Sequence, residues 1–536
     1  MPDPDPARHH DRDSTAVGML QSLIVAFVLA MTFRGFVVEG FVIPTGSMAP
    51  TLLGQHMRLH SDQTGWVFPA GVDPRQRRLH LERVVDPMLG PEYPLAGVTR
   101  GEARPRMGDR ILVLKNLYRF FDPQRFDVMV FKNPTDPNGP AGNYIKRLIG
   151  LPDESIWLVD GDVFAGSADR PDDFQAYEIQ RKPEYIQRAV WQPVYHSDYR
   201  PVYPEGLDVY YRGAPWSGEG WLTEQRRSYR CETDEPTVLR WDERARPIDD
   251  WTAYNMLTPA ADRRRYAVND LRVAAAVVPD RDGLEMTFRL KVRGCEYEYT
   301  IGRDSAVLRM RPATDDGPAS EAGWEGSGAV DIKPLPAGEP TDIEFWHVDQ
   351  AMTIFINGRR VVSYEYDWRP PERLRYATGS NDDVRRLAEF NHIRPAEVSW
   401  AFEGSPVTLH RVRLDRDLYY RPDRLTDHAR RKPTNTGFED VVQTGNYALG
   451  THPDNLAILG PDHFFMLGDN SAASSDSRLW GNPHPLAAVQ IDPAPFVVHR
   501  RLLLGKAWGV YFPAPHPVTE GGKGIIPDFG RLRFIR

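Results

Sequence analysis

Hydrophobic and polar residues are distributed unevenly along the chain, and the longest uncharged stretch lies near the N-terminus. No Asp, Glu, Lys or Arg occurs in the twenty residues from Ser14 to Phe33. A helix of this length rises about 30 Å, the thickness of the hydrocarbon core of a bilayer. A cleavable export signal has a shorter apolar region followed by small residues, but bulky residues follow here. The pattern therefore predicts one transmembrane helix over 14–36, after an N-terminal tail at 1–13.

Shorter runs of β-branched and aromatic residues after this helix are typical of sheet strands. They recur between residues 41 and 131 and are bounded by turn signals such as Gly-Asp and Asn-Pro. In the segment NYIKRLIGLP at 143–152, a period of two places Lys146 between Tyr144 and Leu148 on one face of a strand. The pattern thus predicts a lysine surrounded by apolar side chains.

The middle of the chain carries the clearest strand pattern. Alternating runs separated by turn residues extend from roughly residue 268 to 415, and Asn357-Gly358 is a strong signal for a tight hairpin. Strands at this spacing favour an antiparallel β-sandwich. We therefore predict a mainly β chain with a β-sandwich at 200–425, reached through a connecting segment at 166–199.

Composition limits the functions that the chain can have. Its 536 residues include 47 prolines and 43 glycines, as in a loop-rich globular protein, and its net charge of -8 argues against nucleic acid as a partner. The two cysteines, Cys231 and Cys295, form neither a CxxC motif nor a Cys/His cluster. We therefore predict no metal site and no cofactor. The sequence leaves open whether the two thiols form a disulfide.

Two hydroxyl-bearing segments and the strand lysine call for a common explanation. FVIPTGSMAPTL at 41–52 ends an apolar run in a turn that presents Ser47, and FFMLGDNSAASSDSR at 464–478 ends another in a loop rich in hydroxyls. A serine hydroxyl is a poor nucleophile until a base removes its proton. Lysine can be that base when burial lowers its pKa from about 10.4. The apolar surroundings of Lys146 fit this requirement.

Four segments resemble, in chain order, the characteristic boxes of type I signal peptidases: FVIPTGSMAPTL, GDRILVLK, NYIKRLIGLP and FFMLGDN with SSDSR. Members of that family are membrane-anchored Ser/Lys endopeptidases that remove signal peptides from exported proteins. The resemblance covers roughly residues 15 to 155 and 440 to 515. It implies a peptidase-type β core at 37–165 and 426–536, into which the sandwich is inserted.

The resemblance implies roles for twelve residues of this chain. Ser47 would be the nucleophile and Lys146 the general base, while the Ser47 N–H and the Thr45 hydroxyl would form the oxyanion hole. Ser474 would orient the lysine. The other residues are expected to brace the site (Asp469, Asn470, Asp476 and Arg478) or to line pockets for small substrate side chains (Phe41, Ile43, Met48 and Tyr144).

Three positions depart from the family pattern. Thr45 stands where many relatives carry serine, 153–154 is Asp-Glu in place of Gly-Asp, and 471–473 is Ser-Ala-Ala in place of Arg-Asp-Asn. The threonine keeps the hydroxyl and adds a methyl group that restricts its rotamer. The first two changes leave the chemistry intact, whereas the third alters the shape of the loop.

The resemblance also implies a location and partners. The expected substrates are exported preproteins with small residues before the cut. The chain would cross the inner, cytoplasmic membrane and its lipid bilayer once, with the tail at 1–13 in the cytoplasm and the catalytic domain on the exoplasmic side. The segment IEFWHVDQAMTIFINGRRVVSYEY resembles concanavalin-like and laminin-G-like domains, which implies a glycan or protein partner. We expect this sandwich to fold independently and to project from the core.

Two other functions stay open. In one, the chain is a membrane-anchored glycan- or protein-binding module with a vestigial peptidase core. In the other, it is a soluble self-cleaving repressor of the same Ser/Lys clan. The presence of Ser47, Lys146 and Ser474 argues against the first, and the uncharged N-terminal segment argues against the second.

Overall fold

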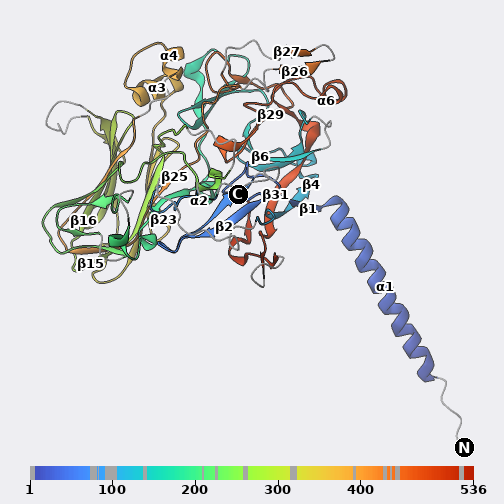
Figure 1. Cartoon of the computed structure of the whole chain (residues 1–536), viewed down its shortest axis with the longest axis horizontal. Helices are drawn as coiled ribbons and strands as arrows, with labels where there is room; N and C mark the ends of the chain where they lie inside the picture. Colours follow the sequence, from blue (N-terminus) through green and yellow to red (C-terminus); the bar gives the residue numbers. More distant parts are fainter. Residues whose placement is uncertain are drawn as a thin grey trace, which may run out of the picture.

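The computed structural model is mainly β, as the sequence predicts (Figure 1). It describes the chain except for residues 1–6, 73–80, 82–83, 91–104, 137–141, 208–210, 224–226, 258–263, 314–322, 390–393, 426–430, 435–436, 441–446 and 518–523. The first residues of the expected tail and the expected start of the second core segment at 426 therefore lie outside the described residues.

One large sheet is built from both ends of the chain. Its strand order is β1 (Val38–Val42), β4 (Arg110–Lys115), β31 (Leu503–Phe512), β5 (Val128–Lys132), β6 (Asn143–Gly150), β29 (His463–Leu467) and β30 (Val498–His499), and β34 (Arg533–Phe534) pairs with β31. Neighbouring strands are antiparallel. Because β29 lies next to β6, the strand that carries Lys146 lies beside the strand that leads into the Gly-Asp-Asn loop.

Smaller sheets flank this core sheet. The chain leaves β6 into a four-stranded sheet in the order β28 (Ala457–Ile458), β7 (Glu154–Val159), β8 (Asp162–Ser167) and β9 (Glu178–Ile179). The two-stranded sheets are β2 (His56–His60) with β3 (Val67–Gly71), β26 (Arg431–Thr434) with β27 (Gly437–Asp440), and β32 (His516–Pro517) with β33 (Gly524–Ile526). The short helix α6 (Pro485–Gln490) follows β29.

The middle of the chain forms two further large sheets. One has the order β12 (Trp221–Leu222), β13 (Ser228–Cys231), β25 (Val407–Arg416), β15 (Leu271–Pro279), β21 (Thr341–Val348), β22 (Ala351–Ile356) and β23 (Arg359–Glu365), with β10 (Gln192–His196) beside β25. The other has the order β11 (Trp216–Ser217), β14 (Thr237–Trp241), β24 (Glu397–Glu403), β16 (Glu285–Val292), β17 (Cys295–Ile301), β18 (Ser305–Pro312) and β19 (Glu325–Gly326), with β20 (Val330–Asp331) beside β18.

These two sheets enclose one apolar core, as alternating strands should. Buried and partly buried residues alternate along the whole of β16, which is the pattern of a strand with one face on a core. Phe288 of β16 stacks on Phe345 of β21 in the other sheet, with ring centroids 5.1 Å apart. Asn357 and Gly358 have φ of 50° and 73°, as the predicted tight hairpin requires. Cys231 and Cys295 are both buried free thiols.

The expected connecting segment at 166–199 contains regular structure of its own. Helix α2 (Glu184–Val190) leads into β10, which pairs with β25 of the sandwich. The sandwich sheet thus begins before residue 200. The sequence reading missed this because β10 is short and contains Pro193, which lowers its strand signal.

The sandwich packs against the core at two places. Leu374 of α3 (Pro370–Thr378) and Leu387 of α4 (Val384–Glu389) share a buried cluster with Trp157 of β7 and Phe164 of β8. At a second place, the short helix η6 (Ala253–Asn255) packs its Tyr254 against the loop after β1. Apolar burial at two places gives the two parts a packed interface.

Helix α1 (Ala7–Phe36) leaves the body of the protein as a single rod ahead of β1 (Figure 1). The side chains described along residues 17–29 are all exposed. Among the described residues, no helix is long and apolar enough to cross a membrane.

Candidate active site

Ser47 lies in a tight turn directly after β1. The turn is closed by backbone hydrogen bonds from Ala49 N to Gly46 O (3.0 Å) and from Leu52 N to Met48 O (2.8 Å). Pro44 and Gly46 disfavour further extended strand here, so the chain turns and buries Ser47 to 9% exposure. The serine is thus held on a rigid turn at the edge of the core sheet.

Lys146 of β6 reaches this serine. Its Nζ lies 2.6 Å from Ser47 Oγ, and the side chain is 3% exposed. Burial lowers the pKa of the Lys146 ammonium to about 8, although Asp476 and Asp469 act in the opposite direction. A substantial fraction of this amine is therefore neutral near pH 8 and able to accept a proton from the hydroxyl.

Ser474 lies beside this pair. A Cβ added at Gly468 would come within 2.1 Å of Ser474 Oγ and 2.5 Å of Ser47 O, so glycine is needed where the two loops meet. The Ser474 hydroxyl is buried and has no hydrogen-bond partner among the described residues. Its expected contact with the lysine is absent from this geometry, and its orienting role remains a prediction.

Two carboxylates of the expected bracing group are held by arginines. Asp469 accepts from Arg147 Nε (2.7 Å) and Nη2 (2.6 Å), and Asp476 accepts from Arg478 Nε and Nη2, each at 2.9 Å. All four side chains are buried. Asp476 also accepts from the backbone N–H of Gly468 (3.1 Å). Charge-assisted bidentate pairs of this kind fix the loop that carries Ser474.

Asn470 joins this loop to the serine turn. Its backbone N–H donates to Ser47 O (3.0 Å), and its side-chain Nδ2 donates to Gly46 O (2.9 Å). These two bonds hold consecutive carbonyl groups of the turn.

The four expected pocket residues divide into two kinds. Ile43 and Met48 are buried in an apolar cluster with Leu52, whereas Phe41 and Tyr144 are only partly buried. Lys146 Nζ lies 5.9 Å from the centroid of the Tyr144 ring. Tyr144 therefore lies beside Lys146, whereas Ile43 and Met48 belong to an apolar cluster against which Phe41 packs. Thr45 is exposed at the start of the turn.

Several residues at the site were missed by the sequence reading. Arg147 is one, because the strand pattern was read for the face that carries Lys146 and not for the opposite face. A second charge inside the apolar run YIKRLIGL was the available signal. Thr51, whose hydroxyl donates to Asp469 at 2.5 Å, gave no signal of its own. The same is true of Tyr254 and Asn255, which come from the insertion.

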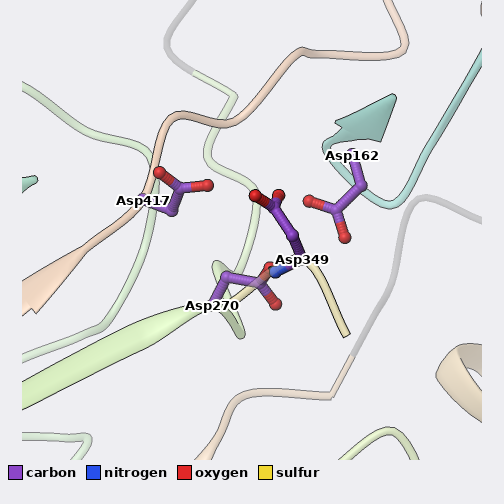
Figure 2. Close-up of side chains that lie close together, drawn as sticks. All are labelled: Asp162, Asp270, Asp349 and Asp417. Atoms are coloured by element: carbon purple, nitrogen blue, oxygen red, sulfur yellow. The ribbon is translucent and has the colours of Figure 1, made fainter. Parts of the chain in front are cut away.

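A separate cluster of acidic residues lies where the sandwich meets the core. Figure 2 shows Asp162, Asp270, Asp349 and Asp417 with their carboxylates turned toward one another. One oxygen from each lies within 4.8 Å of the others, and all four residues are buried. This spacing is compatible with a bound cation.

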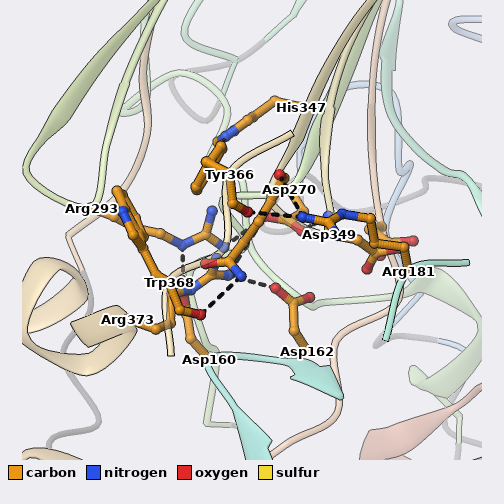
Figure 3. A network of polar contacts seen from close by, with 12 residues as sticks. Asp160, Asp162, Arg181, Asp270, Arg293, His347, Asp349, Tyr366, Trp368 and Arg373 are labelled. Carbon is orange, nitrogen blue, oxygen red and sulfur yellow. Dashed lines mark hydrogen bonds and ion pairs between the residues drawn. The ribbon is translucent and has the colours of Figure 1, made fainter. Parts of the chain in front are cut away.

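Cations from the chain itself already occupy this cluster. Lys182 Nζ lies 2.5 Å from Asp349 Oδ1 and 2.8 Å from Asp417 Oδ2. The arginine pairs are Arg293 with Asp160 (2.6 Å) and Asp270 (2.6 Å), and Arg373 with Asp162 (2.6 Å) and Asp160 (3.2 Å), as Figure 3 shows in part. Burial and the nearby Asp270 also raise the pKa of Asp162, which reduces the negative charge to be balanced. We therefore describe the group as an ionic junction between the sandwich and the core.

Comparison with known proteins agrees with the motif around Lys146. Residues 102–193, which include Lys146, match the family described as signal peptidase, peptidase S26. Signal peptidase I of Pseudomonas fluorescens is 30% identical over 137 residues, which are 25% of this chain and 32% of that protein. Signal peptidase I of Pseudomonas aeruginosa is 29% identical over 156 residues, 29% of this chain and 39% of that protein. The chain thus spans about a third of the length of these curated relatives.

Solved structures are similar only in a limited way. A carbohydrate-binding module, CBM66, from Bacillus subtilis is 7% identical and aligns with 38% of this chain and 97% of its own, with a TM-score of 0.23. The galectin LEC-6 of Caenorhabditis elegans is 14% identical over 29% of this chain and 90% of its own, with a TM-score of 0.17. We draw nothing about the ligand of the sandwich from scores this low.

Proposed function

We propose that the protein is a membrane-anchored serine endopeptidase that removes signal peptides from exported preproteins, because its residues 102–193 match the family of signal peptidases. The observation that carries the proposal is the 2.6 Å contact between Lys146 Nζ and Ser47 Oγ, with both residues buried. A serine hydroxyl held against a buried amine of lowered pKa is the arrangement that nucleophilic catalysis by serine requires.

The reaction begins with proton transfer within this pair. The neutral Lys146 amine takes the Ser47 hydroxyl proton as Oγ attacks the carbonyl carbon of the scissile peptide bond. The resulting tetrahedral intermediate collapses when the Lys146 ammonium gives its proton to the leaving amine, which leaves an acyl-enzyme ester on Ser47. Water then attacks the ester while Lys146 accepts a proton from it. As this second intermediate collapses, Lys146 returns the proton to Ser47 Oγ, and the signal peptide leaves with a new carboxyl group.

Charge on the carbonyl oxygen is stabilised by the Ser47 N–H and by the Thr45 hydroxyl. A donor of this kind contributes roughly 3 to 4 kcal/mol in comparable sites. Thr45 is exposed at the start of the turn, so its hydroxyl is accessible to a bound substrate. Ser474 orients the lysine, for which its buried hydroxyl, unpaired among the described residues, is available.

Membrane attachment is the second part of the proposal. It is supported by the twenty uncharged residues from Ser14 to Phe33 and by the exposed side chains along residues 17–29. The anchor holds the catalytic body on the exoplasmic side of the inner membrane, where the cleavage sites of exported preproteins emerge. Phe41 and Tyr144 then line the surface that receives the small side chains before the cut.

A cleavage assay tests this function. Purified full-length protein in detergent is incubated with a peptide that contains a small-x-small signal-peptide site, and the products are identified by mass spectrometry. We expect one cut after the second small residue, loss of the cut in Ser47→Ala, and normal activity in the matched variant Ser475→Ala, which changes an exposed serine of the same region. Wild-type protein that folds and binds the peptide without cutting it would favour a binding module with a vestigial core.

A further inference from the structure

The inserted sandwich reaches the serine turn through one short segment. Helix η6 brings Tyr254 against the turn, where an added Cβ at Gly46 would lie 2.1 Å from its ring, and an added Cβ at Gly71 of β3 would lie 2.2 Å from it. The Tyr254 ring also packs on Ala49 and is 3% exposed. The two glycines therefore provide the space into which this ring fits.

The next residue, Asn255, is hydrogen-bonded to the loop that holds the turn. Asn255 Nδ2 donates to Asn470 Oδ1 at 2.7 Å, and Asn470 Nδ2 donates to Asn255 Oδ1 at 2.8 Å. Both side chains are buried. Two reciprocal bonds between carboxamides fix the position of the Asn470 side chain far better than one bond would.

The Asn470 side chain in turn acts on the peptide unit that carries the proposed oxyanion donor. Asn470 Nδ2 donates to Gly46 O at 2.9 Å. The Gly46 carbonyl and the Ser47 N–H belong to the same planar trans peptide unit, so their directions are rigidly linked and opposed. Holding Gly46 O therefore sets the direction in which the Ser47 N–H points.

We propose that Asn255 is a positioning residue for catalysis, through which the inserted sandwich orients the Ser47 N–H of the oxyanion hole by way of Asn470. The inference rests on the proposed peptidase function and deepens it. The insertion then completes the active site in addition to any partner that it binds. Asn255 can have this positioning role without contacting either the substrate or Lys146.

The test compares steady-state kinetics of Asn255→Ala with those of the wild type. We expect kcat to fall about 10- to 100-fold, since a loosened oxyanion donor loses part of the hundredfold or larger effect that such donors have. KM should change less than about threefold, and the apparent pKa of kcat/KM should not move, because the lysine is untouched. Asn269→Ala is the matched control, since Asn269 is also a buried asparagine of the insertion but bonds to Arg394 O; it should keep wild-type kinetics.

A double variant separates positioning from general support of the fold. If Asn255 acts through Asn470, then Asn470→Ala alone should lower kcat at least as far, and adding Asn255→Ala should lower it no further. Multiplicative losses, or a wild-type kcat in Asn255→Ala, would overturn the inference. If Asn255→Ala does not fold, Asn255→Asp keeps the shape and removes the donor to Asn470 Oδ1, and the same kcat criterion applies to it. Absence of cleavage by the wild type would instead refute the proposed function.

Discussion

Lys146 and Lys182 are two buried lysines whose environments push their pKa values in opposite directions. Burial lowers the pKa of both ammonium groups. At Lys146 the effect of burial is larger than that of the nearby carboxylates, and the pKa falls to about 8. At Lys182 the contacts with Asp349 and Asp417 outweigh burial and raise the pKa well above its usual value. One lysine is thus suited to exchange a proton, and the other is a permanent cation.

The two pKa values differ because the neighbouring carboxylates bind different cations. Both sites have two aspartates nearby, but those near Lys146 are bound to arginines: Asp469 to Arg147 and Asp476 to Arg478. Lys182 instead contacts its two carboxylates directly. The ion pairs of the candidate site therefore have an electrostatic consequence, because a carboxylate that is bound to an arginine stabilises the Lys146 ammonium less. Burial alone does not make a lysine a base.

The largest expected effect is the loss of activity when either member of the dyad is removed. Ser47→Ala, Lys146→Ala and the double variant should each lose a similar factor in kcat, on the order of 10⁴ to 10⁶, because a base contributes little without its nucleophile. Lys146→Arg should be equally inactive, since a guanidinium keeps its proton. Single-turnover cleavage assays measure these factors, and independent, multiplicative losses would contradict the dyad.

The next largest effect concerns the stability that Lys182 provides. Lys182→Met leaves Asp349 and Asp417 buried without their cation, and removing one partner of such a group costs about 3 to 5 kcal/mol. Urea unfolding of the purified variant should show this loss. The control is Lys291→Met, because Lys291 pairs loosely with Glu397 on the surface and should change stability by less than about 0.5 kcal/mol. Equal midpoints for the two variants would show that the ionic junction does not hold the parts together.

The pH dependence of cleavage tests the Lys146 side of the comparison. The base must be neutral, so kcat/KM should be at its plateau above the pKa of about 8 and should fall as pH drops below it. The fall should approach tenfold per pH unit, which puts the rate at pH 6 about a hundredfold below the plateau. Initial rates at low substrate concentration give this profile. A flat profile over that range would mean that Lys146 is not the titrating base.

The contact between Ser47 and Lys146 could be predicted from sequence because the signals of both residues are local, and their catalytic roles stay a prediction. Ser47 follows Pro-Thr-Gly at the end of an apolar run, and Lys146 lies inside a run of strand residues, so each motif is contained in a dozen positions. The alternation of the sandwich strands is local in the same sense, and β16 shows it residue by residue.

The contacts between the sandwich and the core could not be predicted in this way. Lys182 contacts Asp349 across 167 positions, and Asn255 contacts Asn470 across 215. The sequence around Lys182 or Asn255 contains no local pattern that identifies the distant partner. Turn and strand propensities report on neighbours in the chain, whereas these pairs depend on how two folded parts pack. The expectation that the sandwich folds independently stays a prediction.

The smallest expected effect is a gain in stability when Lys146 is replaced by an apolar residue. The folded-state pKa of Lys146 is about 8, against an ordinary value of 10.5, so the unfolded chain binds the proton more tightly. Burying the charged Lys146 ammonium therefore lowers the free energy of unfolding by its full amount below pH 8. This cost decreases as pH rises toward 10.5, because the unfolded chain then loses the same proton. At about 1.4 kcal/mol per pKa unit, Lys146→Met should raise the free energy of unfolding by about 1 to 3 kcal/mol at pH 7. The urea midpoint of the variant should be higher than that of the wild type at pH 7, and the two midpoints should converge at pH 10. A variant that is less stable than the wild type at pH 7 would mean that its surroundings stabilise the Lys146 ammonium, as they do that of Lys182.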